Sequence, residues 1–131
     1  MSVIDSLNNL FYKIHDEVKI QFPEIKIDTN LSSIDNKFSG LVSFNNLIFN
    51  VNSIGKQQRK LSDIIFNIMD KLGILVIKTD FNTQMHIDHN YIMFKYVAFI
   101  NIPYDNYNIK EEMIESSLLN LKNSDTYWIF I

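Results

Sequence analysis

The sequence predicts an α+β fold, a single mainly antiparallel sheet with three helices packed on it. Three segments place apolar residues at three- and four-residue spacing, which is typical of amphipathic helices. Other segments alternate apolar with polar residues, which is typical of half-buried strands. The resulting order of elements is α-β-β(-β)-α-β-β-α-β. Helices that separate antiparallel strand pairs in this way pack on one sheet in a layered domain.

Size and composition narrow the class of protein. The 131 residues are expected to form a single domain, 1–131, because a chain of this length buries one continuous core. Apolar residues make up 47% and charged residues 21%, as in folded rather than disordered proteins. A net charge of −3 with a single arginine argues against direct nucleic-acid binding, which needs clustered basic residues. The chain has no cysteine, so neither a disulfide framework nor a thiolate zinc site is predicted.

The first predicted helix covers the opening segment and stops before Pro23. Its apolar stripe consists of Ile4, Leu7, Phe11, Ile14 and Val18. Charged residues interrupt this stripe, so the segment is predicted to be neither a signal peptide nor a membrane span, and a cytoplasmic protein is expected. Residues 24–28 then alternate Ile25 and Ile27 with charges, which predicts a strand. Residues 29–36 are predicted to form a loop.

The next segment, residues 38–53, alternates on both sides of Asn45 and Asn46. Asparagine tolerates a positive φ, so the pair predicts either the turn of a hairpin or a bulge in one long strand. We favour the hairpin. The central helix covers residues 57–73, because its apolar residues form one stripe and Gly73 stands where a helix ends on a left-handed residue.

Two strands, a helix and a last strand complete the predicted order. Residues 74–80 form a short apolar run, which predicts a strand with little exposed surface. In residues 91–102 the even positions are apolar, which predicts a long strand ended by Pro103. Asn108 and Glu111 have the spacing of a capping box and start the third helix. The residues that this helix should bury are Ile109, Met113, Ile114, Leu118 and Leu121. Residues 126–131 are predicted to form the last strand.

The stretch "MHIDHNY" raises the question of a metal site. His86, Asp88 and His89 are ligand types for zinc or non-heme iron, which need three or four such groups facing one point. The same residues also suit a hairpin loop between a strand ending near residue 87 and one starting at Tyr91. We favour the structural turn and predict neither a bound metal nor another cofactor.

Catalytic motifs are missing from the sequence. No serine stands in a Gly-x-Ser-x-Gly elbow, and the chain has three glycines, too few for a glycine-rich phosphate loop. Adjacent carboxylates such as Glu111 and Glu112 point in different directions on a helix and serve capping or solvation. The sequence therefore predicts a protein that is not an enzyme.

Three groups of residues are candidates for a partner interface. Lys56, Arg59 and Lys60 form the single basic cluster, which is either a solvated helix start or a contact to an acidic partner. Tyr104 and Tyr107 stand in a polar loop, and either pack on their own sheet or lie at an interface. The apolar end with Tyr127 and Trp128 lies inside the sheet or pairs with another chain, because an exposed apolar strand invites association.

The sequence is rich in Ile, Asn, Lys, Phe and Tyr, which AT-rich codons supply, and has one alanine, Ala98. With its length, acidity, lack of cysteine and order of elements, the chain resembles the tail-terminator or tail-completion type of neck protein of tailed bacteriophages. The resemblance implies a non-enzymatic virion protein, assembled in the host cytoplasm as a homo-oligomeric ring at the head–tail connector. The alternative is a cytoplasmic adaptor, chaperone-like protein or host-defence inhibitor that binds partner proteins as a two-fold dimer. A ring needs a head-to-tail interface and a dimer an isologous one.

Overall fold

The computed structural model describes residues 3–20, 22–35, 37–102 and 111–122. Its elements, in chain order, are α1 (Val3–Val18), β1 (Lys26–Ile34), β2 (Lys37–Asn50), α2 (Ile54–Lys71), β3 (Leu75–His86), β4 (Tyr91–Ile102) and α3 (Glu111–Lys122). The strands form one antiparallel sheet in the order β1-β2-β4-β3. The predicted α+β class and order of elements are thus confirmed, while the strand predicted at 126–131 and the cap predicted at Asn108 lie outside the described residues.

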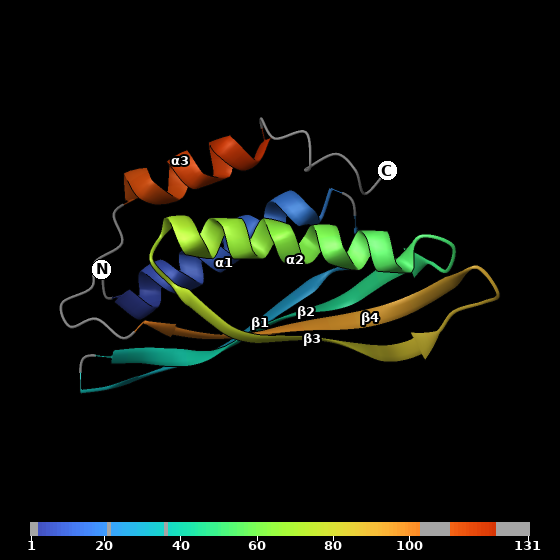
Figure 1. Ribbon diagram of the computed structural model, residues 1–131, viewed down its shortest axis with the longest axis horizontal. Coiled ribbons are helices and arrows are strands. Elements are labelled where there is room, and N and C mark those ends of the chain that lie inside the picture. Colours follow the sequence, from blue (N-terminus) through green and yellow to red (C-terminus); the bar gives the residue numbers. More distant parts are fainter. Residues whose placement is uncertain (1–2, 21, 36, 103–110, 123–131) are drawn as a thin grey trace.

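The elements stack in layers (Figure 1). Helices α1 and α2 lie side by side on one face of the sheet, and α3 lies on the two helices, farther from the sheet. No described helix or strand covers the opposite face of the sheet. The core lies between the sheet and the first two helices, because the apolar stripes of the helices meet the apolar face of β2 and β4 there.

The two central strands supply the sheet's side of the core. In β4 the predicted even positions do face the helices, and Tyr96, Ala98 and Ile102 are fully buried. In β2 the residues opposite them, Val42 and Phe44, are also fully buried. Alternation of side chains along a strand explains this pattern, since every second residue of a regular strand points to the same face.

The prediction of a hairpin at Asn45 and Asn46 is wrong, and the alternative of a bulge is correct. Strand β2 pairs with β4 on both sides of this pair, as Phe44 lies opposite Tyr96 and Leu47 opposite Phe94. Asn46 has a φ of +64°, the left-handed conformation that asparagine tolerates. The extra residue keeps the apolar residues on both sides of the bulge directed into one core, which is why the strand continues.

Two further predictions about strands are wrong. Residues 29–34, predicted as loop, continue β1, because Thr29 and Leu31 face the helices while polar residues alternate with them. The apolar run after α2 was expected to be buried, but it begins the edge strand β3. There Leu75 is 50% exposed and Ile77 65% exposed. An apolar run fits both a central strand and an edge strand, and only the strand order separates them.

The C-terminus of α2 forms a Schellman motif, as the glycine predicted. The Gly73 N–H donates to the Asp70 carbonyl at 3.1 Å, and the Ile74 N–H donates to the Met69 carbonyl at 2.9 Å. Gly73 has a φ of +71°, a conformation that costs little without a Cβ. The motif reverses the chain into β3 and satisfies two carbonyls at the end of the helix.

We expect Gly73→Ala to lower the free energy of unfolding by about 1 kcal/mol, because alanine is strained at positive φ. Gly73→Asn is the matched control and should cost less, since asparagine accepts the left-handed conformation more readily. Urea denaturation of both variants checks this expectation. An alanine variant as stable as the asparagine variant would contradict it.

Helix α3 presents Ile114, Ser117 and Leu118 to the other two helices, all of them buried. The predicted burial of Ile114 and Leu118 is therefore confirmed. Met113 was predicted to be buried as well but is 36% exposed, because the neighbouring helices cover a narrow stripe of α3 only. Ile109 and the Leu121 side chain lie outside the described part of the chain.

Candidate functional site

The residues of "MHIDHNY" form the turn of the β3–β4 hairpin and the strand ends next to it. The Asp88 carboxylate Oδ1 accepts hydrogen bonds from the N–H groups of Asn90 at 2.7 Å and Tyr91 at 3.0 Å. This is an Asx turn, in which a side chain holds the backbone of its own loop. His86 ends β3, His89 lies in the loop, and both side chains are exposed. The structural turn is therefore the role that the geometry supports for Asp88.

Groups that could hold a metal ion do not converge here. Within the described residues, no three His, Cys, Asp or Glu side chains lie close enough together to bind one ion. The absence of a metal site stays a prediction for the whole chain, because the described residues are only part of it.

We expect Asp88→Ala to destabilise the protein by about 1 kcal/mol, because it removes both acceptor bonds of the turn. His86→Ala and His89→Ala are matched controls on the same hairpin and should change stability by less than about 0.5 kcal/mol, as exposed side chains do. Thermal unfolding with and without added Zn²⁺ makes the comparison. Stabilisation by Zn²⁺ that is lost in both histidine variants would contradict the structural role.

The basic cluster occupies the first two turns of α2. Lys56 and Arg59 are exposed, and no acidic residue stands in the first turn of this helix. The pKa of Lys60 is lowered, first by desolvation and then by the charge of Lys56, while Asp63 opposes both effects. Positive charge near a helix N-terminus is unfavourable. A role of the cluster in contacting an acidic partner stays a prediction.

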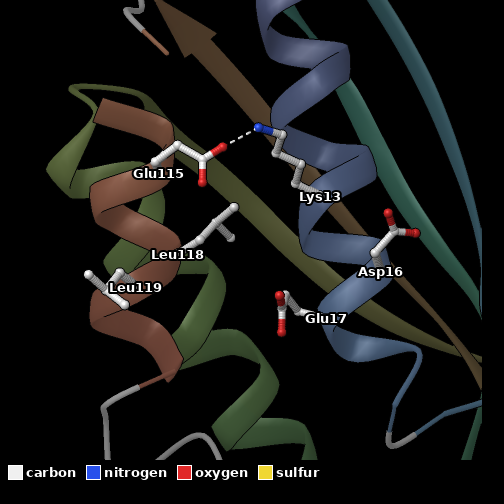
Figure 2. A pocket seen from close by; sticks show the side chains of 6 residues that line it. All are labelled: Lys13, Asp16, Glu17, Glu115, Leu118 and Leu119. Carbon is white, nitrogen blue, oxygen red and sulfur yellow. Dashed lines mark hydrogen bonds and ion pairs between the residues drawn. The ribbon is translucent and has the colours of Figure 1, made fainter. Parts of the chain in front are cut away.

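A cleft of about 260 Å³ separates α1 from α3 (Figure 2). Lys13 of α1 forms an ion pair with Glu115 of α3 across one end of it. Asp16, Glu17, Leu118 and Leu119 complete the lining. The ion pair joins the outer helix to the inner one, so we assign this cleft a structural role.

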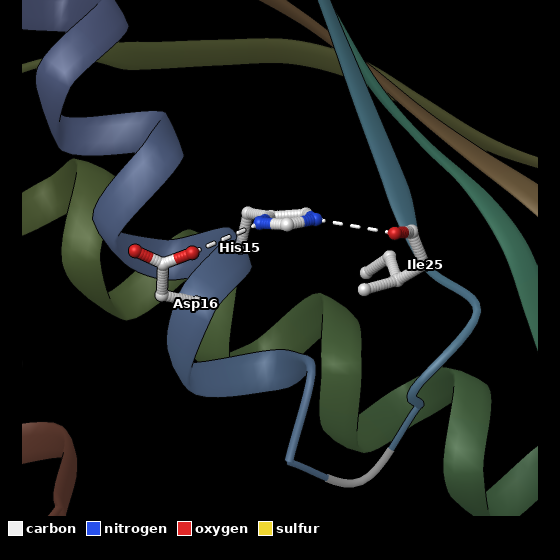
Figure 3. Close-up of polar contacts among 3 residues, drawn as sticks. All are labelled: His15, Asp16 and Ile25. Carbon is white, nitrogen blue, oxygen red and sulfur yellow. Dashed lines mark hydrogen bonds and ion pairs between the residues drawn. The ribbon is translucent and has the colours of Figure 1, made fainter.

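His15 also has a structural role (Figure 3). Its Nε2 lies 3.1 Å from the Ile25 carbonyl oxygen, and its Nδ1 lies 3.2 Å from the Asp16 carboxylate. A donor Nε2–H satisfies the Ile25 carbonyl just before β1 begins. The imidazole therefore connects the end of α1 to the start of the first strand.

Tyr96 carries a buried polar group in the centre of the core. Its ring lies 4.6 Å from the Phe81 ring, centroid to centroid, and its hydroxyl makes no hydrogen bond of good geometry to any described residue. Burial raises the pKa of Tyr96, while Ser62 and Thr79 oppose the shift as loose partners of the hydroxyl. A buried hydroxyl without a full partner costs stability.

We expect Tyr96→Phe to keep or raise the free energy of unfolding, by up to about 1 kcal/mol, because the poorly paired hydroxyl disappears. Its raised pKa also gives a sign for the pH dependence. The folded state favours the neutral phenol. The contribution of this preference to the free energy of unfolding is therefore complete below about pH 10 and is lost as the pH rises further. The Tyr96→Phe variant has no phenol to ionise, so it should not show this part of the loss of stability at alkaline pH. Chemical denaturation at neutral and alkaline pH measures both effects, and a large destabilisation at neutral pH would contradict the expectation.

The main candidate for a binding site is the sheet face opposite the helices, which we call the uncovered face. It carries large apolar side chains from β2, β3 and β4, namely Leu41, Ile48, Ile77, Met85, Met93 and Phe99. Ile77 and Phe99 are 65% and 38% exposed. With Leu41 they line a shallow hollow of about 380 Å³. Exposed apolar groups gathered on one face of a protein mark sites of protein–protein contact.

The sequence of β4 carries a signal for this face. In residues 91–102 the odd positions include Tyr91, Met93, Val97 and Phe99, so β4 is apolar on both faces. A strand that is apolar on both faces is covered on both faces in most proteins. Among the described elements, helices cover only one of these faces, and the other is the candidate surface for a partner.

The remaining predicted interface residues, Tyr104, Tyr107, Tyr127 and Trp128, lie outside the described residues, so their role stays a prediction. No family model, curated protein or solved structure matches the chain. Among the helices that the structure describes, none has the length and apolar character needed to cross a membrane.

Proposed function

We propose that the chain is a non-enzymatic protein that acts by binding proteins, including copies of itself, through the uncovered face. The observation that carries the proposal is the group of apolar side chains on that face, of which Ile77 and Phe99 are among the more exposed. Such residues are unfavourable in water and gain from burial against another protein surface.

Within this class, the proposed role is that of a ring-forming subunit of the tail-terminator or head–tail neck type of tailed bacteriophages. The order of elements supports this role, and so does the bias toward amino acids that AT-rich codons supply. Such a subunit would assemble in the host cytoplasm and remain in the virion. Neighbouring copies in a ring meet through two different surfaces, so the uncovered face would contact a different region of the next subunit.

The second candidate is a small cytoplasmic adaptor or inhibitor that works as a two-fold dimer. One observation favours it, namely that residues of both charge signs lie in neighbouring rows of the uncovered face. Such a surface is able to pair with itself, as an isologous interface requires.

The mass of the purified protein in solution, measured by light scattering over a concentration series, separates the two roles. Closed rings in this measurement and in negative-stain images would support the neck role. A dimer that captures a further protein would support the adaptor role. A chain that stays monomeric at every concentration and binds no protein would contradict both.

A further inference from the structure

The side chains of the uncovered face form rows that run across the strands. Near one end lies a first patch, Leu41, Ile77 and Phe99, on β2, β3 and β4. Near the other end lies a second patch, Ile48, Met85 and Met93, on the same three strands. Each apolar patch has one residue from each of the three strands, so the two patches match in number and in place.

Charged residues occupy the two rows between the patches. The row next to the first patch has Asp28 on β1 and Asp80 on β3 at its ends and Ser43 and Val97 between them, and we call it the acidic row. A basic row with Lys26 on β1 and Lys95 on β4 follows, next to the second patch. Within the described part of the chain, neither Lys26 nor Lys95 forms an ion pair. Lys78 of β3 lies in the row of the first patch, opposite Phe99, and its Nζ is 3.4 Å from the Asp80 carboxylate. Apart from Lys78, the order along the strands is apolar, acidic, basic, apolar.

We propose that the uncovered face is the interface of a homodimer, in which two copies stack sheet on sheet about a two-fold axis between the acidic and the basic row. The axis runs across the strands, so it places each strand over the same strand of the second copy and reverses its direction. The acidic row of each copy then meets the basic row of the other, and the first patch meets the second. This inference rests on the second candidate role, the two-fold dimer, and names its partner as a second copy of the chain.

The residue pairs follow from this axis. Asp28 lies over Lys26 of the second copy on β1, Leu41 over Ile48 on β2, and Phe99 over Met93 on β4. Opposite charges attract across such an interface and fix its register. An axis parallel to the strands would instead place Asp28 over Asp80, and like charges in contact are unfavourable. The Asp28–Lys26 pair on β1 thus selects one of the two symmetric arrangements. Asp80 lies over Asn82 of the second copy in this arrangement, and Lys95 lies over Val97.

The size of the face suits a stable dimer. Four strands about 4.8 Å apart and about 12 residues long cover an area on the order of 800 Å². An interface of ordinary size buries about 800 Å² on each partner. Two sheets packed face to face lie about 10 Å apart, a spacing that interdigitated Phe, Ile and Met side chains fill.

The first test places a charge in the apolar part of the interface. Wild-type protein is expected to elute at twice the chain mass of 15.4 kDa. This should hold at protein concentrations of about 1 to 100 µM, the range in which two chains associate through an interface of this size. Phe99→Asp should be monomeric with an unchanged far-UV circular dichroism spectrum. Ile20→Asp is the matched control, since Ile20 is 63% exposed and follows α1, on the other side of the sheet. This control variant should remain dimeric.

The second test examines the axis itself. Lys26→Asp and Asp28→Lys each place like charges together, so each should weaken the dimer at least about tenfold. The double variant Lys26→Asp/Asp28→Lys exchanges the two charges and should restore the dimer. Both residues are exposed on the edge strand β1, so these changes leave the core intact.

The outcomes separate the inference from the proposed function. A monomeric wild type over the whole concentration range overturns the inference, and the proposed function then depends on capture of another protein. An oligomer that persists in Phe99→Asp overturns the inference but leaves self-association in place. Loss of the dimer in Phe99→Asp without rescue by the charge exchange overturns the two-fold axis. Rescue by the double variant supports the proposed dimer in full.

Discussion

Gly40→Ala is expected to destabilise the protein by about 2 to 4 kcal/mol, because the site combines a strained backbone with no room for a side chain. Gly40 lies in β2 opposite Leu31 of β1 and has a φ of +157°. A Cβ built there would overlap the Asn30 carbonyl oxygen and would lie 2.8 Å from the Leu31 Cα. Both obstacles are backbone atoms of the neighbouring strand, so relief requires that β1 and β2 move apart.

Gly55→Ala is the control for this prediction. Gly55 lies in the first turn of α2, and an added Cβ meets nothing within 4 Å. Alanine should therefore stabilise the helix by about 0.5 to 1 kcal/mol. Urea denaturation of both variants at one protein concentration compares them, since self-association would otherwise shift the result. Equal stability of the two variants would contradict the steric account of Gly40.

Phe49→Ala should lower the free energy of unfolding by about 3 to 5 kcal/mol, the range for loss of a fully buried aromatic ring. Phe49 has no exposed surface and stands at the centre of an aromatic cluster. Its ring centroid lies 5.3 Å from that of Phe22, 5.6 Å from that of Phe94 and 6.1 Å from that of Phe81. The variant leaves a cavity that these large rings cannot fill without changing their own contacts.

Phe66→Ala provides the matched comparison, because Phe66 is 41% exposed on α2. Its loss should cost less than about 1 kcal/mol. Guanidinium denaturation monitored by circular dichroism gives both values. A cost below about 1 kcal/mol for Phe49→Ala would mean that the cluster does not form the centre of the core.

The sequence predicted the elements better than their exposure. The helical periodicity predicted α1 and α2, and Gly73 marked the end of α2, because these features depend on local geometry. The hairpin at Asn45 and Asn46 was wrong because a left-handed residue suits a turn and a bulge equally. The choice between them depends on β4, a strand more than forty residues later in the chain.

The candidate site was the part that the sequence predicted least. The turn role of Asp88 followed from local residue preferences, and the structure agrees with it. The uncovered face depends instead on strand order and on the side of the sheet that the helices occupy, and alternation within a single strand specifies neither. Ile77 shows this limit, since a run of apolar residues placed it in a buried strand and the sheet order places it at an edge.

Irregular pairing in β3 has a consequence for growth of the sheet. Its register shifts between Val76 and Lys78 and again between Thr83 and Met85, and Lys78 and Asp80 add charges on the same strand. Bulges and charges make an edge strand a poor template for another strand, because the free N–H and C=O groups no longer form an even row. Further copies are therefore hindered from adding edge to edge at β3. Growth of the sheet by added strands should therefore be disfavoured at this edge.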